Sequence, residues 1–171
     1  MDSFASDTYG EITYKGIDVL LETFPEYFNN SEGVFYDLGS GNGDLSIYIA
    51  SKTPLKKVCG IELHTERCNE SKEKSKDLKL NQLSFIESNF LDVDLSDATI
   101  VYFANEGIPK IICHKIWDKL PKGCLLICGR RIKNSETRKK YKWTEPIEKK
   151  CISNEKWIYF SKSQKYIIKE E

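Results

Sequence analysis

A glycine-rich turn after a short apolar run holds the residues of this chain that are best suited to bind a ligand. Residues 33–36, Gly-Val-Phe-Tyr, lead into residues 37–44, Asp-Leu-Gly-Ser-Gly-Asn-Gly-Asp, and a second apolar run over 58–61 ends in Glu62. Glycines let a backbone approach a ligand closely, and a carboxylate after the next strand can accept the hydroxyl protons of a ribose. The pattern predicts an adenosyl pocket with these contacts: Asp37, Gly39, Gly41, Gly43, Asp44 and Glu62.

The type of adenosyl ligand depends on the residue at the sixth position of the glycine pattern. Dinucleotide sites carry a small residue there, beside a pyrophosphate. In this chain the position is Asp44, whose carboxylate would repel a phosphate at the start of the following helix. S-adenosylmethionine has no phosphate and carries a sulfonium and an ammonium, which suit a pocket rich in acids. We therefore predict an S-adenosylmethionine site rather than a nicotinamide or flavin site.

Bulk composition predicts one globular domain in a reducing compartment. The chain has 171 residues, a formal net charge of zero and six cysteines that stand singly. That cysteine spacing favours buried thiols over disulfides and predicts no metal site. No run of 18 apolar residues and no secretory leader is evident, so we expect an intracellular protein of the nucleus or cytoplasm, without a membrane contact.

Strand-like and helical patterns alternate along the chain, which is typical of a parallel sheet with helices on its faces. Helices are expected over 14–28, after Gly43, over 65–78 and from Pro109 to about 120. Parallel strands are expected at 34–38, 57–62, 83–87, 99–103 and 124–128, and the tail from Trp143 is expected to add antiparallel strands. We predict an α/β, Rossmann-like class I methyltransferase fold with a mostly parallel seven-stranded sheet and a terminal antiparallel strand.

A single domain over residues 1–171 accommodates three predicted parts. Residues 1–30 form a loop that closes over the cofactor and a helix, 31–130 the cofactor-binding core, and 131–171 a basic connection with the terminal strands. Ligands of open parallel sheets bind beyond the carboxyl ends of the strands, which adds two residues to the site. We expect Asn89 to accept a proton from the adenine amino group and Phe90 to pack on the adenine ring. The alternative for Asn89 is a simple turn before Leu91.

Asn105 ends the strand that runs through residues 100–104. An amide there can present its oxygen to an incoming amine beside the methyl donor, provided that the amine is neutral. Burial favours the neutral form of a lysine amine. Methyl transfer then needs mainly alignment and exclusion of water. The alternative is an ordinary Asn-Glu-Gly turn without a role in binding.

Several of these motifs, taken in order, resemble the non-SET histone lysine methyltransferases of the disruptor-of-telomeric-silencing family. The similarity covers Tyr-Gly-Glu-Ile-Thr at 9–13, Tyr-Asp-Leu-Gly-Ser-Gly at 36–41, the strand before Glu62, Asn-Phe-Leu at 89–91 and the strand before Asn105. It extends from residue 9 to about 128. The resemblance implies that Tyr9, Glu11 and Thr13 contact the cofactor, that Asn105 faces the acceptor lysine, and that Trp157 forms a wall of the lysine channel.

The chain departs from that family at several points. The family places an acid where Asn89 stands and an uncharged amide where Asp44 stands. The family's larger helical N-terminal region and lysine-rich tail are not found, so we expect a minimal catalytic core. A basic segment offers contacts to acidic protein or phosphate, with a solvated loop as the alternative. Its residues are Arg130, Arg131, Lys133, Arg138, Lys139 and Lys140.

A second resemblance and several other functions stay open. Lysine methyltransferases that act on mitochondrial ATP synthase and carrier proteins share the patterns at 93–97 and 126–131 but generally lack an amide at the position of Asn105. Methylation of a small metabolite, or cofactor binding without catalysis, is also possible, whereas base methylation is disfavoured because no Asn-Pro-Pro-Tyr type motif follows the fourth strand. We predict an S-adenosylmethionine-dependent protein lysine N-methyltransferase directed at histones or nucleosomes.

Overall fold

Six strands form one sheet in the computed structural model, which describes residues 12–129 and 165–168. The strand order is β3-β2-β1-β4-β5-β6; β1 to β5 are parallel, and β6 is antiparallel to β5. The strands are β1 (Val34–Leu38), β2 (Lys57–Glu62), β3 (Leu83–Glu87), β4 (Ile100–Phe103), β5 (Leu125–Cys128) and β6 (Lys165–Ile168). This order confirms the expected parallel sheet with an antiparallel terminal strand. A seventh strand, expected in the tail after Trp143, falls outside the described residues.

The helices of the described residues follow the expected pattern, except that the first is divided near Pro25 and the one expected over 65–78 already ends at Ser75. They are α1 (Tyr14–Thr23), α2 (Pro25–Phe28), α3 (Asp44–Lys52), α4 (Thr65–Ser75) and α5 (Lys110–Lys119). The single helix expected over 14–28 is wrong, because Phe24 leaves the helical conformation with φ −123° and ψ 52°. Proline has no N–H to donate and disfavours a helical residue before it. Pro25 therefore ends α1 and begins α2.

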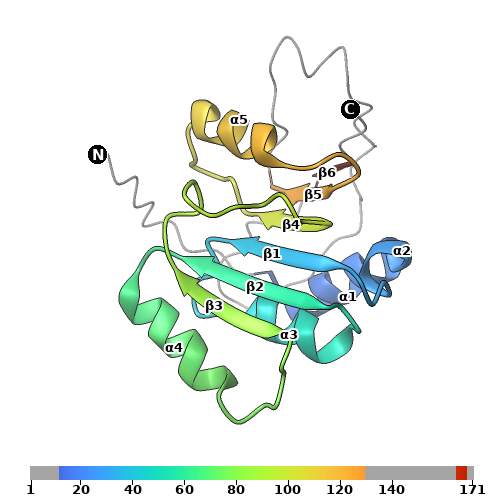
Figure 1. The fold of residues 1–171 in the computed structure, drawn as a ribbon, viewed down its shortest axis with the longest axis vertical. Helices are drawn as coiled ribbons and strands as arrows, with labels where there is room; N and C mark the ends of the chain where they lie inside the picture. The colour runs from blue at the N-terminus through green and yellow to red at the C-terminus, as the bar shows by residue number, and fades with distance from the viewer. Residues whose placement is uncertain (1–11, 130–164, 169–171) are drawn as a thin grey trace.

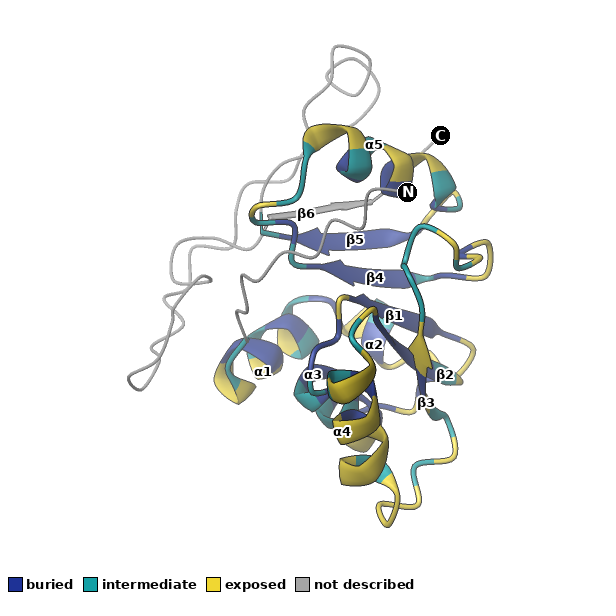
Figure 2. Cartoon of the chain, turned by 90° about the vertical axis from the view of Figure 1, so that its left-hand side faces the viewer, coloured by how far each residue is buried: buried dark blue, intermediate teal, exposed yellow. Residues whose placement is uncertain are grey.

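Helices lie on both faces of the sheet (Figure 1, Figure 2). An apolar cluster packs on each face. Residues of α1, α2 and α3 pack on one face around Phe35, and α5 packs on the other face around Tyr36. Neighbouring residues of β1 point to opposite faces, so every residue of β1 is buried. Burial of a large apolar side chain stabilises the fold by about 1.5–3 kcal/mol. These two clusters bury β1 from both sides.

The register of the parallel strands brings their carboxyl ends to one edge of the sheet, on the left in Figure 1. Leu38 at the end of β1 pairs with Ile61 on one side and with Phe103 on the other. The glycine turn after β1, Glu62 at the end of β2 and Asn105 beyond β4 must therefore lie near one another. This edge is where ligands bind in open parallel sheets.

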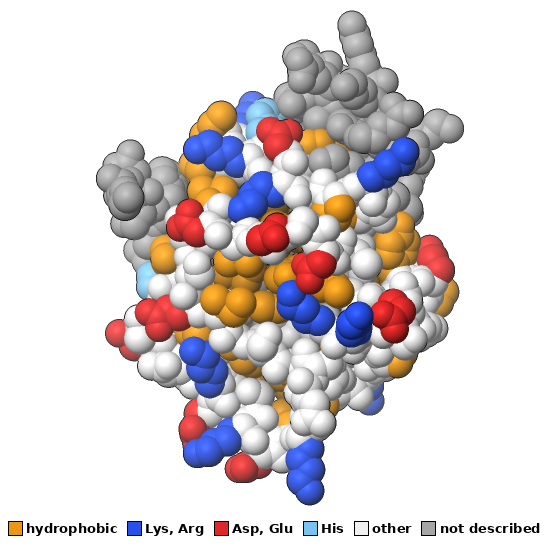
Figure 3. Space-filling model, viewed as in Figure 1, with side chains coloured by type: hydrophobic (Ala, Val, Ile, Leu, Met, Phe, Trp, Pro, Cys, Tyr) orange, Lys and Arg blue, Asp and Glu red, His pale blue; other side chains and the backbone are white. Residues whose placement is uncertain are grey.

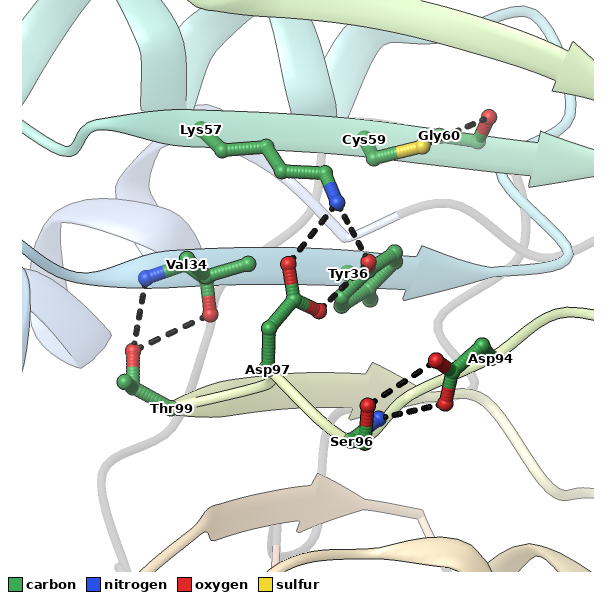
Figure 4. Close-up of polar contacts among 9 residues, drawn as sticks. All are labelled: Val34, Tyr36, Lys57, Cys59, Gly60, Asp94, Ser96, Asp97 and Thr99. Atoms are coloured by element: carbon green, nitrogen blue, oxygen red, sulfur yellow. Dashed lines mark hydrogen bonds and ion pairs between the residues drawn. The ribbon is translucent and has the colours of Figure 1, made fainter.

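A polar network fastens the connection between β3 and β4 to the sheet (Figure 4). The Lys57 Nζ lies 3.0 Å from the Asp97 carboxylate, and the Tyr36 hydroxyl donates to the same carboxylate at 2.7 Å. The Thr99 hydroxyl oxygen accepts from the Val34 N–H at 2.8 Å. Burial opposes the charge of Asp97, but the hydrogen bonds from Tyr36 and Lys57 hold its pKa below the usual value. The network anchors the loop that begins with Asn89.

The face of the molecule seen in Figure 3 carries charges of both signs around a central hydrophobic area. Several opposite charges pair on the described surface, among them Lys56 with Glu32 at 3.1 Å. Such exposed pairs add little stability, about 0–1 kcal/mol each. In residues 12–129 and 165–168, no helix is long and apolar enough to cross a bilayer. The five described cysteines are buried, as expected, and Cys151 falls outside the described residues.

Candidate active site

The turn after β1 is held against β2 by its own backbone. The N–H groups of Gly39 and Ser40 both donate to the Ile61 carbonyl oxygen at 2.9 Å. Gly39, Gly41 and Gly43 have φ values of 84°, 56° and 85°, which side-chain-bearing residues rarely adopt. The glycine spacing is thus required by the backbone path of the turn.

Gly39 and Gly43 differ in the space that is available for a side chain. A Cβ on Gly39 would have no atom within 4 Å, so open space lies there. A Cβ on Gly43 would stand 2.6 Å from the Ser71 Cβ and 2.7 Å from the Phe85 ring. Gly43 therefore permits close packing of α3 against α4 and β3, whereas Gly39 faces a space that a ligand can enter.

The Glu62 carboxylate joins the glycine turn to the loop after β2. One of its oxygens, Oε2, accepts from the Gly41 N–H at 2.8 Å, and the other accepts from the His64 N–H at 2.9 Å. The side chain is buried, and these two bonds fix its position. Each carboxylate oxygen has a second lone pair. Both oxygens can therefore still accept from the two hydroxyl groups of a ribose.

Asp37 lies beneath the turn and is only 3% exposed. Its carboxyl group accepts from the Ser46 hydroxyl of α3 at 3.0 Å. Burial raises the pKa of Asp37 to about 7; the Ser46 hydrogen bond opposes this rise, and the nearby Glu62 carboxylate adds to it. A positively charged ligand next to Asp37 would favour its ionised form.

Asp44 has a partner within the protein. Its carboxylate forms an ion pair with Lys74 of α4 at 3.2 Å, and Lys74 also pairs with Glu70 at 3.3 Å. The negative charge of Asp44 is thus partly compensated before any ligand binds. A contact between Asp44 and the cofactor stays a prediction.

Asn89 forms the turn before Leu91 that was the alternative to an adenine contact. Its amide oxygen accepts from the Leu91 N–H at 2.9 Å, which closes an Asx turn. The oxygen expected to accept from an adenine amino group is therefore already engaged once. The Phe90 ring packs edge-on against Phe103, with centroids 5.4 Å apart. The adenine contacts of Asn89 and Phe90 stay predictions.

Asn105 occupies the tip of β4 in a tight turn. Its carbonyl oxygen accepts from the Ile108 N–H at 3.3 Å, and Gly107 has a φ of 77°, as expected for the third position of a type II turn. The side chain is 1% exposed, and its amide nitrogen donates to the Cys113 Sγ at 3.8 Å. The turn considered as an alternative is present, and it holds the amide buried against α5.

Of the remaining predicted contacts, the structure describes only Thr13, whose contact with the cofactor stays a prediction. Thr13 caps α1, because its hydroxyl oxygen accepts from the Gly16 N–H at 3.1 Å. The remaining predicted contacts, Tyr9, Glu11 and Trp157, and the basic side chains Arg130, Arg131, Lys133, Arg138, Lys139 and Lys140 fall outside the described residues.

The residues at this edge fit S-adenosylmethionine. The Ser40 hydroxyl is buried without a hydrogen-bond partner among the described residues, which marks a polar group that a ligand can satisfy. Together with the space before Gly39 and two buried carboxylates, it suits a ligand with hydroxyl groups and positive charge. Among residues 12–129 and 165–168, no three His, Cys, Asp or Glu side chains gather as metal ligands.

Comparison with known families identifies the chain. Residues 1–156 match the family described as "Histone methylation protein DOT1". The chain belongs to this family. The match confirms the resemblance derived from the motifs and, with it, membership of an S-adenosylmethionine-dependent methyltransferase family.

One relative and two solved structures illustrate the similarity. A protein-lysine N-methyltransferase of Saccharolobus islandicus (strain REY15A) is 29% identical over 100 residues, which cover 57% of this chain and 62% of the relative, less than two thirds of its length. An RNA methyltransferase from Salinibacter ruber, solved with S-adenosyl-L-homocysteine, has a TM-score of 0.65 at 18% identity, over 94% of this chain and 95% of the other. A putative methyltransferase from Escherichia coli has a TM-score of 0.70 at 13% identity, with coverage of 93% and 88%. At these identities the solved structures establish the methyltransferase fold.

The site contains features that the sequence motifs did not reveal. His64 contributes a backbone N–H, Ser40 a buried hydroxyl, and Lys74 a partner for Asp44. Glu106 was not singled out, although its carboxylate lies against Gly129 at the end of β5. The sequence could have predicted a role for Glu106, because it directly follows Asn105 and residues beyond strand ends line such sites.

Proposed function

We propose that this protein transfers a methyl group from S-adenosylmethionine to the side-chain amine of a lysine in a protein substrate. The observation that carries the proposal is the buried Asn105 amide, which lies on the same sheet edge as the glycine turn and Glu62. Membership of the DOT1 family supports the lysine acceptor.

S-adenosylmethionine supplies an electrophilic methyl group when it is bound. Gly39 leaves room for the ligand, and Glu62 binds the ribose hydroxyls with the oxygen lone pairs that Gly41 and His64 do not use. Asp37 adds negative charge below the turn and favours a cationic ligand. The buried walls exclude water and hold the reactants in line.

Asn105 orients the acceptor amine. Its amide nitrogen donates to the Cys113 Sγ, which turns the amide oxygen to the opposite side of the group. That oxygen accepts a hydrogen bond from the neutral amine and directs the nitrogen lone pair along the transfer path. Because burial disfavours a charged amine, the enclosed site also lowers the pKa of the substrate lysine.

Histones are the first candidate substrate, and other proteins are the second. The DOT1 match supports a histone or a nucleosome, for which the protein would act in the nucleus. The name of the Saccharolobus relative specifies lysine in a protein as the acceptor but does not mention histones. The basic segment, with its residues from Arg130 to Lys140, would aid binding to nucleosomal phosphate or acidic protein.

Methyl transfer with radiolabelled S-adenosylmethionine tests the proposal. Intact nucleosomes, free histones and a cell lysate are incubated side by side with the wild-type protein, with Asn105→Ala and with the exposed control Asn81→Ala. We expect label on a lysine of histone protein from the wild type and from Asn81→Ala. Asn105→Ala should lose transfer by about 100-fold or more and keep its affinity for S-adenosylhomocysteine.

The distribution of label separates the candidates. Label confined to a lysate protein other than a histone supports the second candidate. Label only on RNA or on small molecules contradicts the protein substrate. Equal transfer by Asn105→Ala and the wild type would remove Asn105 from the acceptor site.

A further inference from the structure

We propose that Glu106 binds the positive charge of the acceptor amine and thereby selects basic amines as substrates. The inference rests on the proposed function, because it assigns to the same site a group that distinguishes lysine from uncharged acceptors. Glu106 is the only charged residue of the segment 104–109, which forms the rim beyond β4.

The turn beyond β4 determines where Glu106 lies. Asn105 and Ile108 close the turn, and the left-handed Gly107 lets it reverse immediately after Glu106. Glu106 therefore belongs to the same turn as Asn105, one residue beyond the amide that we assign to the acceptor. It lies on the side of Asn105 toward β5, and the glycine turn lies on the other side, toward β1.

Gly129 provides the space that the Glu106 carboxylate occupies. A Cβ built on Gly129 would overlap the Glu106 Oε1 and stand 2.3 Å from Oε2. Any side chain at this position would displace the carboxylate. The glycine beyond β5 thus allows Glu106 to fold back over the tips of β4 and β5.

The chemistry of the acceptor gives such a carboxylate a function. A lysine arrives from water as an ammonium ion and must release one N–H proton to solvent water before its lone pair can attack. After methyl transfer its nitrogen again carries a positive charge. A fixed carboxylate near the nitrogen attracts the arriving cation and stabilises the charge that develops on nitrogen during transfer. It also opposes the loss of the ammonium proton, which burial in the enclosed site favours. A hydroxyl or thiol acceptor gains nothing comparable, so the carboxylate also confers specificity.

Binding of n-butylammonium, which matches the end of a lysine side chain, tests the site without methyl transfer. The protein loaded with S-adenosylhomocysteine is titrated with n-butylammonium, and saturation-transfer NMR measures binding. The wild type is compared with Glu106→Gln, which keeps the shape and removes the charge, and with the exposed control Glu26→Gln. We expect at least a fivefold weaker affinity in Glu106→Gln and wild-type affinity in Glu26→Gln. Neutral n-butanol should bind all three proteins alike.

Gly129→Ala displaces the carboxylate without removing it. The φ angle of Gly129 lies outside the left-handed range, and the atoms that an alanine would meet are the flexible end of Glu106, so the variant should fold normally. We expect weakened n-butylammonium binding in Gly129→Ala alone. In a Glu106→Ala background the same change should have no further effect, because the group that it displaces is gone.

The acceptor kinetics complete the test. With the protein substrate that accepts label, Glu106→Gln should raise the acceptor KM by about tenfold, while the affinity for S-adenosylhomocysteine and the unfolding midpoint stay at wild-type values. Equal binding of n-butylammonium to wild type and Glu106→Gln would overturn the inference. Glu106-dependent binding in a protein that methylates no polypeptide would support the cation site and contradict the lysine substrate, so the two failures can be told apart.

Discussion

The Glu62 carboxylate accepts a hydrogen bond of 2.8 Å from the backbone N–H of Gly41. This contact joins the end of β2 to the middle of the glycine turn, and a second bond from the His64 N–H fixes the other oxygen. A residue expected only to bind a ribose therefore also shapes the pocket. The loop geometry and the ligand contacts depend on the same carboxylate.

Replacing Glu62 with Gln should weaken binding of S-adenosylhomocysteine. The amide of Gln has one acceptor oxygen, so it cannot accept from both Gly41 and His64 and its NH2 would face one of these N–H donors. We expect a loss of about 1.5–3 kcal/mol in binding free energy, measured by calorimetry. The exposed Glu66→Gln on α4 is the matched control and should bind as the wild type does. Unchanged affinity in Glu62→Gln would mean that the pocket lies elsewhere.

Alanine at Gly39 should mainly weaken ligand binding, whereas alanine at Gly43 should mainly lower the stability of the fold. Both positions have positive φ, so each substitution costs about 1–2 kcal/mol of folding stability. Gly43→Ala also forces a Cβ into Ser71 and Phe85, which adds about 1–3 kcal/mol. Gly39→Ala meets no protein atom but fills the ligand space, and we expect at least about a tenfold loss of S-adenosylhomocysteine affinity.

Denaturant unfolding and calorimetry distinguish these two substitutions. Gly43→Ala should show the larger drop in unfolding free energy, and Gly39→Ala the larger loss of ligand affinity at temperatures where both are folded. The reverse order would contradict the assignment of Gly39 to the ligand and Gly43 to packing.

The stability of the ligand-free protein should fall as the pH rises from about 4 to about 7. The pKa of Asp37 is raised from 3.8 to about 7 in the folded state, chiefly by burial, so the folded state holds this proton more tightly than the unfolded state. Its contribution is complete below the unfolded pKa and is lost as the pH approaches the folded pKa. The difference corresponds to about 4 kcal/mol.

Urea unfolding of the wild type and of Asp37→Asn across this pH range measures the effect. The neutral Asn removes the titration, so the difference in stability between the two proteins should change over the range and become constant above about pH 7. Parallel pH profiles of the two proteins would show that Asp37 does not titrate in this window.

Hydrophobic pattern alone predicts the strands because each is a short apolar run with clear ends. The strands expected at 34–38, 57–62 and 83–87 coincide with β1, β2 and β3. Thr99 and Cys124 lie just outside the strands for which they were predicted, since ladder hydrogen bonds rather than residue type define strand ends. Pro25 indicates a helix end, but the helical spacing of Phe24 and Phe28 favoured the prediction of one continuous helix.

Site residues are harder to predict because their hydrogen-bond partners are distant in sequence. The Asp44 carboxylate meets Lys74, and Asn105 meets Cys113, only after α4 and α5 have packed. Asn89 was predicted as a ligand contact, although its amide closes a local turn with Leu91. Residue type and position beyond a strand therefore identify the right region, while the direction of each side chain requires the tertiary structure.

A crystal structure of the protein with S-adenosylhomocysteine tests the central claim most directly. The account predicts that the ligand lies over the ends of β1 and β2, against Gly39, with both ribose hydroxyls hydrogen-bonded to Glu62. An empty crevice at saturating ligand, or a pyrophosphate-containing molecule bound there in its place, would contradict it.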